Sequence, residues 1–125
     1  MLISLTTNKK LIKQLQLDKK ESTIICDNLT VCKNKLGEAE AEYDLFIIDV
    51  DTAKNCLTNL VDFIANQNIF IKTIIFNTSG TLDGVVQKEV NYCVQYLKDQ
   101  QYHAFAVDNS LLSKGLKSFH HSKNT

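Results

Sequence analysis

Residues 43–50 read Tyr-Asp-Leu-Phe-Ile-Ile-Asp-Val, and they contain four consecutive apolar residues followed at once by an aspartate, Asp49. A short apolar run rich in β-branched and aromatic residues is typical of a strand buried on both faces of a parallel sheet. Four similar runs occur elsewhere in the chain, at residues 2–5, 23–26, 69–76 and 104–107. The sequence therefore predicts five buried strands, and residues 45–50 form the third.

Segments between and after these runs carry apolar residues at helical spacing. They lie at residues 11–15, 29–36, 56–64, 83–100 and 111–119. Asp51 or Thr52 is expected to cap the third of these helices, and Asn109 or Ser110 the last. Strands that alternate with helices pair in parallel through right-handed crossovers. We therefore predict an α/β fold, (βα)5, in which a doubly wound parallel five-stranded sheet is covered on both faces.

The size and charge of the chain restrict its class. Its 125 residues fit one domain, which we place at residues 1–119, followed by a polar tail at residues 120–125. The net charge is zero, and all 14 basic residues are Lys. Since the chain has no guanidinium group to form paired hydrogen bonds with bases or phosphates, no nucleic-acid partner is expected. The N-terminus lacks the pattern of a signal peptide, and no apolar stretch approaches the ~18 residues of a membrane span. We expect a cytoplasmic protein without membrane contact.

Cysteine and histidine residues offer no pattern typical of a metal site or an enzyme. The four cysteines, at positions 26, 32, 56 and 93, include no C-x-x-C pair, which favours reduced, buried thiols. Asp27 is expected to raise the pKa of the neighbouring Cys26 thiol. His120 and His121 are adjacent and do not share a helix face, and His103 lies at the start of a strand. We predict no metal, no cofactor and no catalytic residue.

In open α/β sheets, ligands bind beyond the carboxyl ends of the strands. Asp49 is the most informative residue there, because a carboxylate after four buried residues is costly unless it is hydrogen-bonded or liganded. It is either a functional group at the sheet edge or a structural cap for the next loop. The other side chains expected in the strand-end cleft are Thr6, Thr7, Asp51, Asn77, Thr78 and Asp108.

The stretch at residues 43–50, together with the order and spacing of most of the chain, resembles the receiver domain of response regulators. The resemblance implies a flavodoxin-like, receiver-like fold and makes Asp49 the equivalent of the phosphoacceptor. The acidic pair that holds a divalent cation in receivers corresponds here to Thr6 and Thr7. Phe105 corresponds to the aromatic switch residue of the family.

Other positions of the receiver pattern also differ. The Ser or Thr that ends the fourth strand corresponds to Asn77, with Thr78 next, and the Lys that ends the fifth corresponds to Asp108. Phosphoryl transfer needs a metal ion and a cation to neutralise developing charge, so these replacements predict a degenerate receiver, or pseudo-receiver.

The helix predicted at residues 83–100 is longer than its receiver counterpart and changes the surface formed by the fourth helix, fifth strand and fifth helix, which binds partners in the family. Tyr92, Tyr96 and Tyr102 lie in this region, either as interface residues or as apolar cover for the sheet. We therefore predict a signalling module that binds a protein partner or a second copy of itself, independently of phosphorylation. Two alternatives stay open: a phosphorylatable receiver that uses Asp49, and a binder of a small phosphate or flavin ligand at the strand-end cleft.

Overall fold

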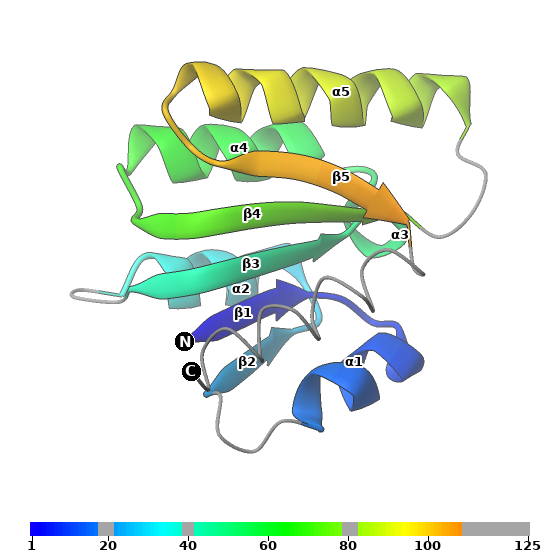
Figure 1. The fold of residues 1–125 in the computed structure, drawn as a ribbon, viewed down its shortest axis with the longest axis vertical. Coiled ribbons are helices and arrows are strands. Elements are labelled where there is room, and N and C mark those ends of the chain that lie inside the picture. The colour runs from blue at the N-terminus through cyan, green and yellow to red at the C-terminus, as the bar shows by residue number, and fades with distance from the viewer. Residues whose placement is uncertain (18–21, 39–41, 79–82, 109–125) are drawn as a thin grey trace, which may run out of the picture.

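The computed structural model describes residues 1–17, 22–38, 42–78 and 83–108. Five parallel strands form one sheet in the order β2-β1-β3-β4-β5 (Figure 1). The strands are β1 (Leu2–Leu5), β2 (Thr23–Cys26), β3 (Tyr43–Asp49), β4 (Ile71–Thr78) and β5 (Ala104–Asp108). The predicted α/β fold with a parallel five-stranded sheet is thus confirmed. The helix predicted at residues 111–119, its caps Asn109 and Ser110, and the tail at 120–125 lie outside the described residues.

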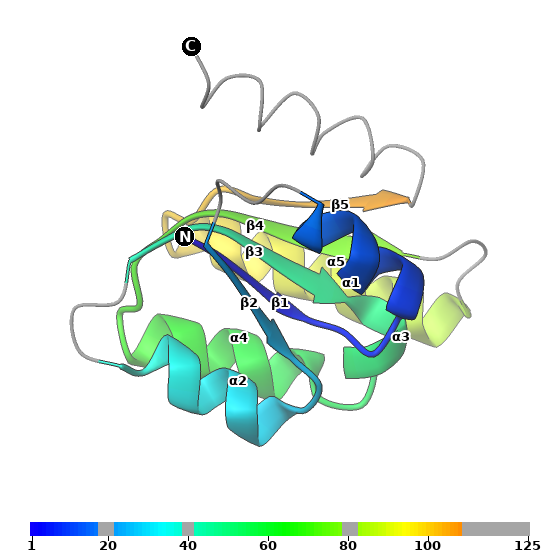
Figure 2. The same cartoon turned by 90° about the horizontal axis from the view of Figure 1, so that it is seen from below.

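The described helices run back along the sheet between the strands. They are α1 (Lys9–Gln16), α2 (Leu29–Leu36), α3 (Val50–Ala53), α4 (Leu57–Asn66) and α5 (Gly84–Asp99). Side-chain caps start four of them, because Asn8, Asn28, Asp49 and Asp83 each accept hydrogen bonds from backbone N–H groups of the first turn. Figure 2 shows α2 and α4 below the sheet and α1 on its other side.

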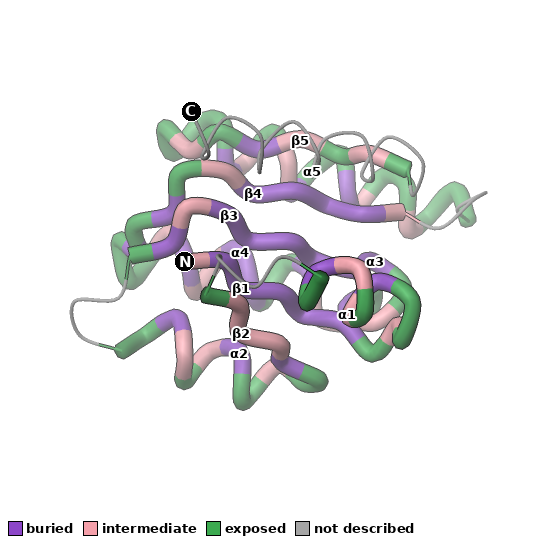
Figure 3. The backbone as a smooth tube through the Cα atoms, turned by 60° about the horizontal axis from the view of Figure 1, so that its bottom comes forward, coloured by how far each residue is buried: buried purple, intermediate pink, exposed green. Residues whose placement is uncertain are grey.

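The core has two layers, one on each face of the sheet (Figure 3). On the face covered by α2, α4 and α5, the neighbouring strand residues Ile3, Phe46 and Ile74 lie in register, and all three are fully buried. On the face covered by α1, Leu11 and Leu15 pack with sheet residues that include Leu45 and Ile47. Among the described helices, none is long and apolar enough to cross a membrane.

The segment after β3 differs from its prediction. One helix capped by Asp51 or Thr52 was expected, but the chain forms the short α3 and, after a turn, α4. The cap of α3 is Asp49, whose Oδ1 accepts a hydrogen bond from the backbone N–H of Asp51 at 3.2 Å. The helical turn therefore starts directly at the end of the strand, before the apolar stripe of α4 begins.

Strand β4 starts two residues later than predicted, because Ile69 takes part in the cap that follows α4. Asn68 adopts φ 50°, in the left-handed region that Asn tolerates. The Ile69 N–H bonds to the Ile64 carbonyl at 3.1 Å, and the Asn68 N–H to the Ala65 carbonyl at 3.2 Å. This pair of bonds is the Schellman motif, which satisfies the last carbonyls of a helix.

Candidate functional site

The carboxylate of Asp49 lies at the end of the central strand and is 2% exposed. Its Oδ2 accepts hydrogen bonds from Thr6 Oγ1 at 2.7 Å and from Thr52 Oγ1 at 3.0 Å, and its Oδ1 accepts the Asp51 N–H. Thr6 is itself fully buried, and its hydroxyl accepts a bond from the Asn8 N–H at 3.0 Å. Of the two readings that the sequence left open for Asp49, the structure supports the structural cap.

Thr52 extends this network to the loop after β1. Its Oγ1 accepts a hydrogen bond from the Thr7 N–H at 3.0 Å and lies 3.1 Å from Thr7 Oγ1. The chain therefore holds β1, β3 and α3 together through one carboxylate and three threonine hydroxyls, which we call the Asp49 cap cluster (Thr6, Thr7, Asp49 and Thr52). Thr52 was predicted as a helix cap and not as a member of this site. The sequence feature that could have indicated it is its position three residues after Asp49, the spacing between an N-cap residue and the residue that pairs with it.

The remaining residues of the predicted cleft lie at the ends of β4 and β5. Asn77 is 1% exposed and sits in register with Asp49 on the neighbouring strand. Thr78 is half-buried, and its hydroxyl donates to the Val107 carbonyl at 3.3 Å. Asp108 is exposed at the end of β5 and is paired in register with Thr78. The sheet thus brings Asp49 and Asn77 together as expected. Asp108 lies on the next strand, β5.

Phe105, for which the resemblance implied the role of a switch aromatic, lies on the edge strand β5. It is half-buried against the α1-side layer of the core, and its ring lies 5.4 Å from that of His103. It is in register with Ile75 of β4. These contacts give Phe105 a packing role at the sheet edge.

The chemistry available at this edge is that of neutral hydroxyls around one carboxylate. Oδ2 of Asp49 accepts two hydrogen bonds and Oδ1 accepts one, so the carboxylate is part of a structural network that joins three segments of the chain. Within the described ranges, no group of three or more His, Cys, Asp or Glu side chains is placed to hold a metal ion.

The four thiols belong to, or pack against, the core layer on the side of the sheet covered by α2, α4 and α5. Cys26, Cys32 and Cys93 are buried and Cys56 is half-buried, all as free thiols. A hydrogen bond with Cys32 lowers the pKa of Cys26, and the same bond together with burial raises the pKa of Cys32. Asp27 does raise the pKa of Cys26, as expected, but the hydrogen bond with Cys32 has the larger effect, so the net shift is downward. Burial raises the pKa of Cys93 to about 11, so this thiol is unreactive at neutral pH.

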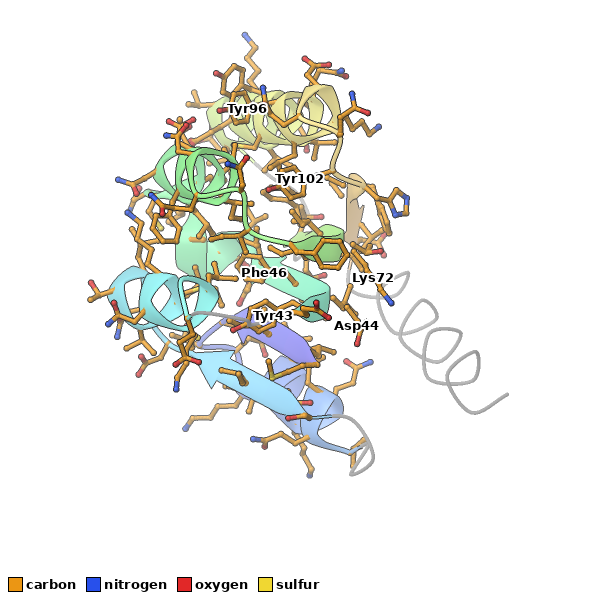
Figure 4. The ribbon with its side chains drawn as sticks, turned by 90° about the vertical axis from the view of Figure 1, so that its left-hand side faces the viewer. Tyr43, Asp44, Phe46, Lys72, Tyr96 and Tyr102 are labelled. Carbon is orange, nitrogen blue, oxygen red and sulfur yellow. The ribbon has the colours of Figure 1, made fainter. Side chains whose placement is uncertain are left out.

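The three tyrosines named as interface candidates lie in two different settings, and Figure 4 labels one residue of each, Tyr96 on α5 and Tyr102 before β5. The Tyr102 hydroxyl donates to the carbonyls of Ile69 at 2.8 Å and Ile64 at 3.3 Å, which links the start of β5 to the end of α4. Tyr92 and Tyr96 lie on α5, and their rings stack at 6.1 Å between centroids. Tyr92 is 56% exposed, so of the three it is the most available to a partner.

Two hollows of the described surface lie away from the Asp49 cap cluster. One, of about 240 Å³, is lined by α2 and α4 residues that include Lys33, Asp62 and Phe63. The other, of about 310 Å³, is lined by residues at the ends of α2 and α4 and before β4. A ligand site at the carboxyl ends of the strands stays a prediction. Comparisons of this chain with family models, with curated proteins and with solved structures found no match.

Proposed function

We propose that this chain is a regulatory module of receiver-like fold that works in the cytoplasm by binding a protein, independently of phosphorylation. The observation that carries this proposal is the state of Asp49, whose two carboxylate oxygens accept three hydrogen bonds from within the chain at 2% exposure. A phosphoacceptor must instead be accessible to its donor, and the 2% exposure of Asp49 leaves little access. The Asp49 cap cluster supports a fold that keeps the receiver scaffold and uses its central aspartate as a cap.

The charges around Asp49 support the same proposal. Thr6 and Thr7 are neutral where receivers place two cation-binding carboxylates, and hydroxyls bind Mg²⁺ weakly by comparison. Asp108 brings a negative charge to the end of β5, where a positive one would stabilise a phosphoryl group. Both differences disfavour the transition state of phosphoryl transfer.

We expect no phosphoryl adduct when the chain is incubated with Mg²⁺ and a small phosphodonor, because Asp49 is occupied and the cation-binding residues are replaced. Intact-mass spectrometry measures the adduct, and an ordinary receiver treated in parallel shows that the donor is active. An adduct that disappears in Asp49→Asn would contradict the proposal and make the phosphorylatable receiver the better description.

The surface that we propose for binding is the outer side of α5. Val85 is 75% exposed and Tyr92 56% exposed, one at the start and one in the second half of the helix. The Tyr92–Tyr96 stack adds a rigid aromatic surface, and such residues are enriched at the centres of interfaces. The partner is either another protein or a second copy of this chain.

Tyr92→Ala is expected to weaken association about tenfold, the effect of removing a tyrosine from the centre of an interface. Analytical ultracentrifugation over a range of concentrations measures self-association directly. The matched control is Leu17→Ala, which removes an exposed apolar side chain at the end of α1 and should leave association unchanged. Equal weakening by both variants would place the interface elsewhere, and a monomer at every concentration would rule out the homodimer.

A further inference from the structure

The hollow of about 310 Å³ lies at the amino-terminal edge of the sheet, opposite the Asp49 cap cluster. Its volume is within the range of small-ligand sites. The side chains that give it chemical character are the carboxylates of Glu38 and Glu42, the amides of Gln67 and Asn68, and the ring of Phe70. No group in this set carries a positive charge.

Two helices end at this hollow. Helices α2 and α4 run antiparallel to the strands, so both finish at the edge where the strands begin (Figures 1 and 2). Their C-caps, Gly37 and Gln67, both line the hollow. The C-terminus of a helix carries a partial negative charge, and two of them favour a cation between them.

Phe70 provides an aromatic wall at the same place. Its neighbour Ile69 is 8% exposed and part of the core, whereas Phe70 is 58% exposed, which is unusual for a residue of its size. An ammonium group over an aromatic face gains a further attraction from the ring quadrupole. The ring also offers apolar surface to the carbon chain that carries the ammonium.

Two described lysines near this edge, Lys35 and Lys72, each form an ion pair. Lys35 Nζ lies 3.4 Å from Glu38 Oε1 in a pair that is about half exposed on both sides, which shows that this wall accepts an ammonium group. Lys72 Nζ lies 3.2 Å from Asp44 Oδ1, and the chain's amino terminus lies 2.7 Å from Asp44 Oδ2 (Figure 4). Asp44 thus shares one negative charge between two cations, and none of these three groups lines the hollow. Within the lining, Glu42 is the carboxylate that gives the hollow its negative charge.

We propose that this hollow binds a primary alkylammonium group, carried either by a free polyamine or by a lysine side chain of a protein. The carboxylates and helix ends supply the charge complementarity, and Phe70 supplies the apolar and aromatic contact. This inference concerns the opposite edge from the Asp49 cap cluster and does not depend on the proposed function.

Titration followed by ¹⁵N–¹H correlation spectra tests the proposal. The probes are 1,5-diaminopentane and a lysine-containing tripeptide, and the matched neutral probe is the same tripeptide with its lysine Nε-acetylated. We expect saturable shifts at residues 36–38 and 67–70 with a charged probe and none with the acetylated peptide. Binding of the diamine identifies a free polyamine as the ligand, and binding of the peptide alone identifies a lysine side chain.

Variants test which groups bind the ammonium. Phe70→Ala and Glu42→Gln are each expected to weaken binding about fivefold, and Lys35→Met, which removes the competing ammonium from Glu38, to strengthen it about twofold. Asp27→Asn, which neutralises an exposed carboxylate at the opposite edge of the sheet, should leave binding unchanged. Shifts that sodium chloride reproduces at equal ionic strength, or that persist at full strength in both Phe70→Ala and Glu42→Gln, would overturn the proposal.

Discussion

Asp49→Ala is expected to lower the free energy of unfolding by about 3 kcal/mol, because it leaves three buried or half-buried donors without their acceptor. Thr6 is fully buried, so its hydroxyl cannot exchange Asp49 for water without a rearrangement of the loop. The variant also removes the cap of α3, which alone is typically worth about 1 kcal/mol. Urea unfolding followed by circular dichroism measures the loss.

Two further variants make this measurement specific. Asp49→Asn keeps one oxygen as an acceptor and, since a threonine hydroxyl can turn to accept from an amide, should lose only about 1 kcal/mol. Asp99→Asn changes an exposed carboxylate at the end of α5, which accepts a hydrogen bond from the exposed Gln95, and should stay within about 0.5 kcal/mol.

The opposite result would change the interpretation of the site. If Asp49→Ala were as stable as the unaltered chain, the cost of burying the carboxylate would offset its hydrogen bonds. A buried group that does not contribute to stability is typical of a functional site. The phosphorylatable receiver, until then an alternative, would become the leading hypothesis for this edge.

The strands were predictable because a strand buried on both faces of a sheet appears in the sequence as a short, continuous apolar run. The run at residues 2–5 and the run at residues 23–26 match β1 and β2 residue for residue. Alternation with helices then leaves few arrangements, and the parallel sheet follows from topology alone. The energetic cost of burying Asp49 could also be predicted from the sequence, because the four apolar residues before Asp49 already indicate that it ends a buried strand.

What could not be predicted depends on contacts between distant parts of the chain. Thr6 and Asp49 are 43 residues apart, and only the register of β1 with β3 brings them within hydrogen-bond distance. The start of β4 was misplaced because Ile69 is as apolar as a strand residue, while its N–H closes the Schellman motif of α4. Tyr102 is a further case, because its partners Ile64 and Ile69 belong to another element.

Phe46→Ala is expected to lower the free energy of unfolding by about 4 kcal/mol, the largest effect of any substitution considered. Phe46 is fully buried on the central strand β3, between Ile3 of β1 and Ile74 of β4, beneath the helices α2, α4 and α5. Removing its ring leaves a cavity that three helices and two strands would have to fill, and a close-packed interior does so only in part.

Two matched variants separate burial from the loss of an aromatic ring as such. Phe46→Leu keeps most of the apolar volume and should cost about 1.5 kcal/mol. Phe70→Ala makes the same change of residue at a position that is 58% exposed and should stay within about 0.5 kcal/mol in the same urea experiment. If Phe46→Ala and Phe70→Ala were equally mild, the layer between the sheet and α2, α4 and α5 would not be the main source of stability. If they differ as expected, Phe70 can be removed without harm to the fold, which is the condition for using it to test the ammonium site.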